Sequence, residues 1–96
     1  MNNEKYLVGS FLLDKYIDGK IKCLQHARIE LWYKGNLISK VFTDNCGNYI
    51  FTIDDIGCYE LRGFCRNKCA NKKILIDETC DRIIIKHLLL ENKKDS

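Results

Sequence analysis

The segment TDNCGNYIF, residues 43–51, combines a turn signal with the start of a strand that has a recognisable inner face. Its first half is rich in Asp, Asn and Gly, which tolerate positive φ or bond their side chains to the nearby backbone. From Tyr49 onward, successive residues alternate between a face that is more apolar and aromatic and a face that is less so, which is the period of a strand. The segment therefore predicts a β-hairpin, with Asp44 and Gly47 as its structural turn residues.

The same alternation marks the segments on either side of this hairpin. Residues 26–33 predict a half-buried strand, residues 37–43 predict the strand that enters the turn, and residues 58–65 predict another strand beyond it. If the aromatic and aliphatic positions of these strands share one interior, the core contains Ile29, Leu31, Tyr49, Phe51, Tyr59 and Leu61.

Two further apolar segments complete an all-β pattern. Residues 6–13 are apolar on both parities, as in a strand covered on both faces, and residues 83–90 predict the last strand because they begin with three β-branched isoleucines. Strands at this spacing, separated by Gly, Asn and Asp turns, are typical of a sandwich or barrel. We expect a single all-β domain over residues 1–90 and a flexible polar tail over 91–96.

The sequence also predicts two turns and a loop, and its charge bears on the kind of partner. The pairs Asp18-Gly19 and Gly35-Asn36 predict chain reversals, and the cationic run over residues 66–73 predicts a solvated loop. The chain has 16 basic and 13 acidic residues, a formal net charge of +3. A nucleic-acid-binding protein more often has a strongly basic, clustered face, so we expect no nucleic-acid partner.

A secretory signal peptide has a positive n-region, then an apolar stretch, then a cleavage site with small residues. The N-terminal sequence MNNEKYLVGSFLLDK does not show this pattern. The longest apolar run, IIIKHLLL, is far shorter than the roughly 20 residues that span a bilayer. We therefore expect no membrane insertion and no cleaved signal peptide.

The order of motifs carries a resemblance to a known family. The pieces T-D-x-x-G-x-Y-x-F, from Thr43, and G-x-Y-x-L, from Gly57, resemble the prealbumin-like modules of bacterial collagen-binding surface proteins (B-type repeats) and of carboxypeptidase regulatory domains. The resemblance implies a single antiparallel β-sandwich of about seven strands, prealbumin-like or Ig-like. It also implies a role as stalk, spacer, pilin piece or adhesion domain.

Many of those B-type modules carry an isopeptide bond between a lysine of the first strand and an asparagine of the last, promoted by a buried acid. In this chain the nearest matches are Lys15 and Asn92, but Arg62-Gly63 follows the Tyr59 strand where the acid would lie. We therefore expect no such bond.

The sequence carries no catalytic signature, and we expect a protein that is not an enzyme and needs no cofactor. Hydrolases of purine-breakdown intermediates share the transthyretin-like fold, but they resemble one another in histidines and a C-terminal YRGS that this chain lacks. His26 and His87 are the two histidines, and each is expected to be an ordinary strand residue. A Gly-rich phosphate loop and a G-x-S-x-G elbow are also missing.

The six cysteines are the remaining side chains that could form covalent bonds or bind a metal. Disulfides within or between chains are the leading interpretation, and reduced thiols are the alternative. Six cysteines allow 15 pairings, so the spacing does not determine which cysteines would pair. A structural zinc site is a weaker alternative, since Cys65 and Cys69 have C-x₃-C spacing that Cys58, Cys80 or His87 would complete. The disulfide candidates are Cys23, Cys46, Cys58, Cys65, Cys69 and Cys80.

The outward parity of the strand over residues 26–33 predicts an interface. Trp32 points outward beside Arg28 and Glu30, and Trp and Arg are enriched where binding energy concentrates. Cys46 and Cys80 fall in predicted turns, where bonds between chains would not distort the sheets. We expect self-association, or binding to another surface protein.

The sequence thus predicts a non-enzymatic structural or adhesion module, a subunit of a cysteine-cross-linked surface or fibre-like assembly. It would lie outside the cell or on the cell or spore surface. The alternative is a cytoplasmic binding module with reduced thiols. One form of this alternative holds a structural zinc.

Overall fold

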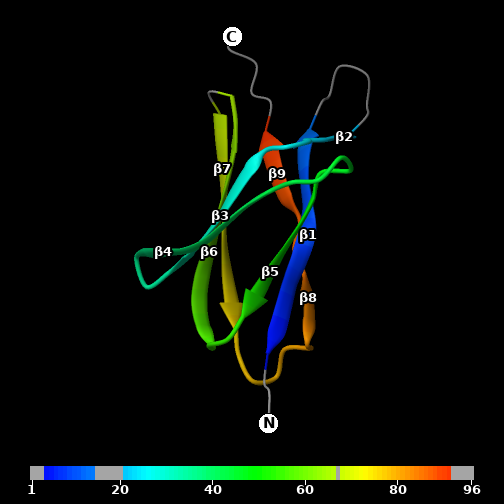
Figure 1. Ribbon diagram of the computed structural model, residues 1–96. Coiled ribbons are helices and arrows are strands. Elements are labelled where there is room, and N and C mark those ends of the chain that lie inside the picture. The colour runs from blue at the N-terminus through cyan, green and yellow to red at the C-terminus, as the bar shows by residue number, and fades with distance from the viewer. Residues whose placement is uncertain (1–3, 15–20, 67, 92–96) are drawn as a thin grey trace.

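The computed structural model describes residues 4–14, 21–66 and 68–91, and all of their regular structure is β (Figure 1). No helix long and apolar enough to cross a membrane is found in these ranges. The strands are β1 (Lys5–Asp14), β2 (Ile21–Cys23), β3 (Arg28–Tyr33), β4 (Asn36–Phe42), β5 (Asn48–Ile53), β6 (Gly57–Cys65), β7 (Lys68–Ile76), β8 (Ile83–Ile85) and β9 (Leu88–Glu91).

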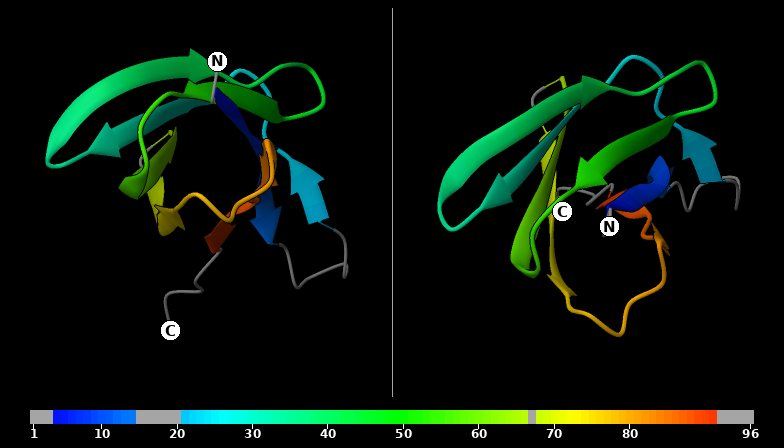
Figure 2. Two further views of the ribbon diagram at one scale, coloured as in Figure 1. Left: turned by 90° about the horizontal axis from the view of Figure 1, so that it is seen from below. Right: turned by 60° about the horizontal axis from the view of Figure 1, so that its bottom comes forward.

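The strands form two sheets that face each other across the core (Figure 2). One sheet is centred on β1, which pairs antiparallel with β5 and β2 and parallel with β8 and β9. The other has the order β4-β3-β6-β7 and is antiparallel throughout. The fully antiparallel prediction is therefore wrong at β8 and β9, and the described residues contain nine strands instead of about seven.

The predicted core is confirmed. The inward parities of β3, β5 and β6 are buried, and so are Leu7 and Phe11 of β1 and the inner residues of β8 and β9. The hydroxyl of buried Tyr59 donates a hydrogen bond of 2.6 Å to the carbonyl of Asp55, so its polar atom is satisfied at the core edge. The buried apolar residues of these strands are Leu7, Phe11, Ile29, Leu31, Tyr49, Phe51, Ile53, Tyr59, Leu61, Ile84, Leu88 and Leu90.

The segment over residues 43–51 contains the predicted turn but is not a hairpin. Oδ1 of Asp44 accepts hydrogen bonds of 2.9 Å from the amides of Cys46 and Asn48, and Gly47 has a φ of +80°. However, β4 pairs with β3 and β5 pairs with β1, so the turn carries the chain from one sheet to the other.

Buried Thr43 explains why the chain leaves the sheet at this turn. Its Oγ1 accepts a hydrogen bond of 2.9 Å from the Ala27 amide and donates one of 2.6 Å to the Leu24 carbonyl. These bonds hold the end of β4 to the segment that enters β3. The turn residues set a reversal locally, whereas the choice of strand partner depends on contacts of this kind.

The tight hairpins lie elsewhere. Lys34 and Gly35, with φ values of +51° and +79°, form the two-residue turn between β3 and β4, so the predicted turn at Gly35-Asn36 is shifted by one residue. The predicted loop over residues 66–73 is also wrong, because β7 begins at Lys68 and pairs with the whole length of β6. Lysines on this edge strand discourage pairing with further chains.

The predicted last strand is interrupted. β8 and β9 keep one register along β1, but the ladder breaks at Lys86 and His87, opposite Gly9 and Ser10. There the Lys86 carbonyl accepts a hydrogen bond from the buried Tyr49 hydroxyl, and Nδ1 of His87 accepts one of 3.1 Å from the Ser10 amide. Burial raises the pKa of Tyr49 well above its usual range, so this hydroxyl keeps its proton.

Some sequence predictions fall on parts of the chain that the structure does not describe. The turn at Asp18-Gly19 lies outside the described residues, as do residues 92–96 of the predicted tail. The predicted tail begins one residue too early, because β9 extends to Glu91.

We expect Gly9→Ala to destabilise the protein strongly. A Cβ at this position would lie 1.7 Å from the Lys86 carbonyl oxygen, so β8 and β9 must move away from β1. The loss in free energy of unfolding should be about 3 kcal/mol or more, measured by chemical denaturation. Ser10→Ala, the neighbouring control, removes a hydroxyl from an exposed hydrogen bond and should cost far less. Equal stability of Gly9→Ala and the parent would show that this close approach is not required.

Gly47→Val should also lower stability, by about 1–3 kcal/mol from backbone strain alone. An added Cβ would additionally lie 2.9 Å from the Cys23 Cβ. Gly35→Val is the matched control, because Gly35 has nearly the same φ but no heavy atom within 4 Å of an added Cβ. Thermal melts of both variants separate strain from contact, and a smaller loss at Gly47 than at Gly35 would contradict the packing described here.

Candidate functional site

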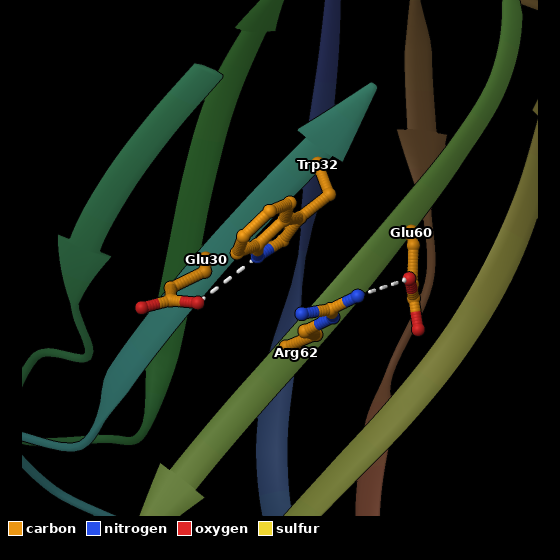
Figure 3. A network of polar contacts seen from close by, with 4 residues as sticks. All are labelled: Glu30, Trp32, Glu60 and Arg62. Atoms are coloured by element: carbon orange, nitrogen blue, oxygen red, sulfur yellow. Dashed lines mark hydrogen bonds and ion pairs between the residues drawn. The ribbon is translucent and has the colours of Figure 1, made fainter. Parts of the chain in front are cut away.

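Trp32, the predicted interface anchor, lies on the outer face of β3 but is covered on one side by its own chain (Figure 3). The guanidinium of Arg62, on the neighbouring strand β6, stacks over the indole with 4.1 Å between its Cζ and the ring centroid. The indole Nε1 donates a hydrogen bond of 2.9 Å to Oε1 of Glu30. The side chain is therefore half-buried, and its polar atom is satisfied within the chain.

The two other predicted interface residues belong to the same array. Nε of Arg28 lies 3.3 Å from Oε2 of Glu30, and the Arg28 guanidinium stacks over the Phe64 ring at 4.4 Å. Arg62 completes the array with an ion pair of 3.0 Å to Glu60. We call this set the ladder face, made of Arg28, Glu30, Trp32, Glu60, Arg62 and Phe64.

The geometry of the ladder face bears on its use as an interface. Each of its charges has an opposite charge or an aromatic ring as a neighbour, so a partner would have to compete with interactions already made. One polar atom of the array, Nε of Arg62, is buried and has no hydrogen-bond partner among the described atoms. The structure thus brings Trp32, Arg28 and Glu30 together, while their role in binding stays a prediction.

The outer face of the β1 sheet is chemically different, and the sequence analysis did not single it out. Val8 of β1 lies between Ile50 of β5 and Ile85 of β8 in one row across three strands, and Tyr6 lies next to Ile83 in the row beside it. The isoleucines are open to solvent, with exposed fractions of 57% for Ile50, 60% for Ile83 and 63% for Ile85.

None of the described side chains that point outward from this sheet is Asp, Glu, Lys or Arg. A surface depression of about 650 Å³ lies beside its apolar row and is also lined by Phe42 from the end of β4. We call this surface the isoleucine face, made of Tyr6, Val8, Ser10, Leu12, Asn48, Ile50, Thr52, Ile83, Ile85, His87 and Leu89.

A sequence signal for the isoleucine face did exist. Ile50 occupies the parity of β5 that should be polar if only one face is buried, and Ile83 and Ile85 flank an inward Ile84. The sequence interpretation used these residues only as strand formers. Large β-branched residues on both parities of a strand that is covered on one face indicate an exposed apolar surface.

The four thiols of the zinc hypothesis do not assemble. Cys58 and Cys69 point outward from β6 and β7, whereas Cys65 packs against the core and Cys80 lies in the turn after β7. No group of three or more His, Cys, Asp or Glu side chains suited to a metal is found among the described residues. The structure therefore does not gather Cys58, Cys65, Cys69 and Cys80, with or without His87, into one ligand set.

Cys80 lies in a turn, as predicted, but it is not fully exposed. Its side chain is partly buried against the core, and its Sγ lies 3.6 Å from Oδ1 of Asp77. Hydrogen bonds from the Thr79 hydroxyl and amide hold the pKa of Asp77 below its usual range. Cys23, Cys46, Cys58 and Cys69 are exposed, and all six cysteines are free thiols.

The two histidines occupy structural positions. His26 has a φ of +52° in the turn before β3, and its amide donates a hydrogen bond to the Thr43 carbonyl. His87 is exposed, and its ring satisfies the Ser10 amide. Lys15 and Asn92, the residues considered for an isopeptide bond, lie outside the described residues.

Comparison with known proteins adds no identification. No family model matches the chain, and no curated protein is significantly similar to it.

The stack of Arg62 on Trp32 can be tested by fluorescence, because the chain contains one tryptophan. Arg62→Ala should shift the emission of Trp32 to longer wavelength, since it exposes the covered side of the indole, and should cost about 1 kcal/mol of stability. Arg28→Ala is the matched control, because it removes a cation that pairs with Glu30 but does not cover the indole. Unchanged emission in Arg62→Ala would contradict the stack.

Proposed function

We propose that the protein is a non-enzymatic structural module, a β-sandwich of the prealbumin-like kind, that self-associates into a surface or fibre-like assembly. The observation that carries the proposal is the isoleucine face. A folded chain gains little in its own stability from the exposed surface of isoleucines, whereas burying that surface against another chain is favourable.

A second copy of the chain is the partner that fits this surface best. Interface cores are depleted of charged residues, and the described part of the isoleucine face contains none. In a two-fold dimer the same patch faces itself, so the uncharged outer faces of the strands meet each other, and Asp44 is a charged residue that lines the adjoining depression. The ladder face is less suited to this role, because binding there would disturb two ion pairs.

The exposed thiols support the cross-linked form of the assembly. Cys58 and Cys69 lie on the outer face of the second sheet, away from the isoleucine face, so bonds through them would extend an assembly beyond a dimer. Such bonds persist in an oxidising environment, which fits a place outside the cell or on its surface. The competing class is a cytoplasmic binding module, in which the thiols stay reduced and another protein covers the isoleucine face.

We expect the parent protein to show reversible, concentration-dependent association in sedimentation velocity with reductant present. Ile50→Thr with Ile85→Thr keeps the β-branched shape that strands favour but makes the face polar, and should weaken the association at least tenfold. Leu37→Thr with Leu75→Thr is the matched control, since these residues are also exposed but belong to the other sheet.

Two further outcomes separate the alternatives. Trp32→Ser should leave the association unchanged if the isoleucine face is the contact, and loss of association in this variant would assign it to the ladder face. Without reductant, covalent oligomers should appear on non-reducing gels and disappear in Cys58→Ser with Cys69→Ser. A parent that stays monomeric at high concentration, with and without reductant, would refute the assembly and favour the binding module.

A further inference from the structure

Two cysteines that are distant in sequence meet at one edge of β1. Cys23 is the last residue of β2, and Cys46 lies in the turn before β5. Leu24 and Gly47, which follow the two cysteines, both form hydrogen bonds with Phe11 of β1. The Phe11 amide donates to the Gly47 carbonyl at 2.8 Å, and the Phe11 carbonyl accepts from the Leu24 amide at 2.9 Å. The two chain segments therefore lie side by side there.

The contact between these segments limits the distance between Cys23 and Cys46. A Cβ at Gly47 would lie 2.9 Å from the Cys23 Cβ and 3.0 Å from the Leu24 amide nitrogen. Because neighbouring Cα atoms are about 3.8 Å apart and a Cα–Cβ bond is about 1.5 Å long, the Cα atoms of Cys23 and Cys46 lie within about 10 Å of each other. Disulfides join Cα atoms roughly 4.4–6.8 Å apart, and both thiols are exposed, so a movement of the turn by at most about 3 Å brings them into bonding range.

We propose that Cys23 and Cys46 are a modification site, where an intramolecular disulfide clasps the end of β2 to the 44–48 turn. The oxidant is a small-molecule disulfide. One thiolate attacks it and releases one small thiol, and the second thiolate then attacks the mixed disulfide and releases the other. Two protein S–H bonds are lost and one S–S bond forms, while the oxidant is reduced to two thiols.

Other pairs are less well placed. Cys58 and Cys69 share an outer face, but Cys69 pairs with Phe64, six residues along β6 from Cys58, which separates them by about 20 Å. Cys80 is turned toward Asp77 and the core. Cys65 lines the same surface depression as Cys23 and is the competing partner, but it belongs to the other sheet and packs against the core.

The clasp would close the base of the β3–β4 hairpin, because both strands lie between Cys23 and Cys46 in sequence. A bond across a loop of about two dozen residues stabilises mainly by restricting the unfolded chain, so the melting temperature should rise by about 10 °C. This effect arises within one chain and does not depend on the proposed self-association.

The test oxidises the reduced full-length chain with glutathione disulfide, alkylates the remaining thiols, and maps the linked peptides by mass spectrometry. Trypsin followed by chymotrypsin is suitable, because cleavage after Tyr49 separates Cys46 from Cys58. We expect a monomer with a peptide containing Cys23 joined to one containing Cys46. We also expect a melting temperature that falls by about 10 °C when reductant is added.

Two variants make the thermal result specific. Cys46→Ser should abolish the dependence of the melting temperature on reductant, and Cys69→Ser, which removes another exposed thiol, should retain it. The proposal is overturned if Cys23 and Cys46 carry separate glutathione adducts, if Cys23 links to Cys65, or if the link joins two chains. It is equally overturned if Cys46→Ser keeps the full reductant dependence.

Discussion

The close approach of the Lys86 carbonyl to the bare backbone of Gly9 is the contact on which the β1 sheet depends. Gly9 pairs with Tyr49 of β5 on one edge of β1, and the Tyr49 hydroxyl reaches the Lys86 carbonyl on the other. Three chain segments thus meet at one residue without a side chain. The arrangement satisfies a carbonyl that the interrupted ladder leaves unpaired, and it holds β8 and β9 parallel to β1 over the core.

The two outer faces divide the chemistry of the surface between them. The polar groups of the ladder face find partners within the chain, since Glu30 binds Arg28 and Trp32 of its own strand, and Arg62 of the neighbouring strand stacks over Trp32. The isoleucine face does not, because its exposed apolar side chains have no neighbour that could cover them within the described chain. A surface that lacks both charge and cover is the one that gains most from contact with another copy.

The cysteines show how spacing along a chain can mislead. Cys65 and Cys69 are four residues apart, a spacing that suits a metal site in a loop, yet the register of β6 against β7 puts them on opposite faces of the sheet. Cys23 and Cys46 are far apart in sequence, yet the edge of β1 brings their neighbours Leu24 and Gly47 into contact. Pairing of thiols is decided by strand partners that spacing does not report.

The amino-acid sequence by itself determined the inward positions of several strands and the turn over residues 44–48. A period of two residues assigned Ile29, Leu31 and Tyr59 to the interior, and Asp44 with Gly47 set a turn through bonds to nearby backbone. Only the tertiary structure decided that β5 pairs with β1, that β8 and β9 run parallel to it, and that Ile50 is left exposed. Alternation and turn chemistry act between neighbours in sequence, whereas strand pairing is a competition among distant segments that depends on the whole assembled core.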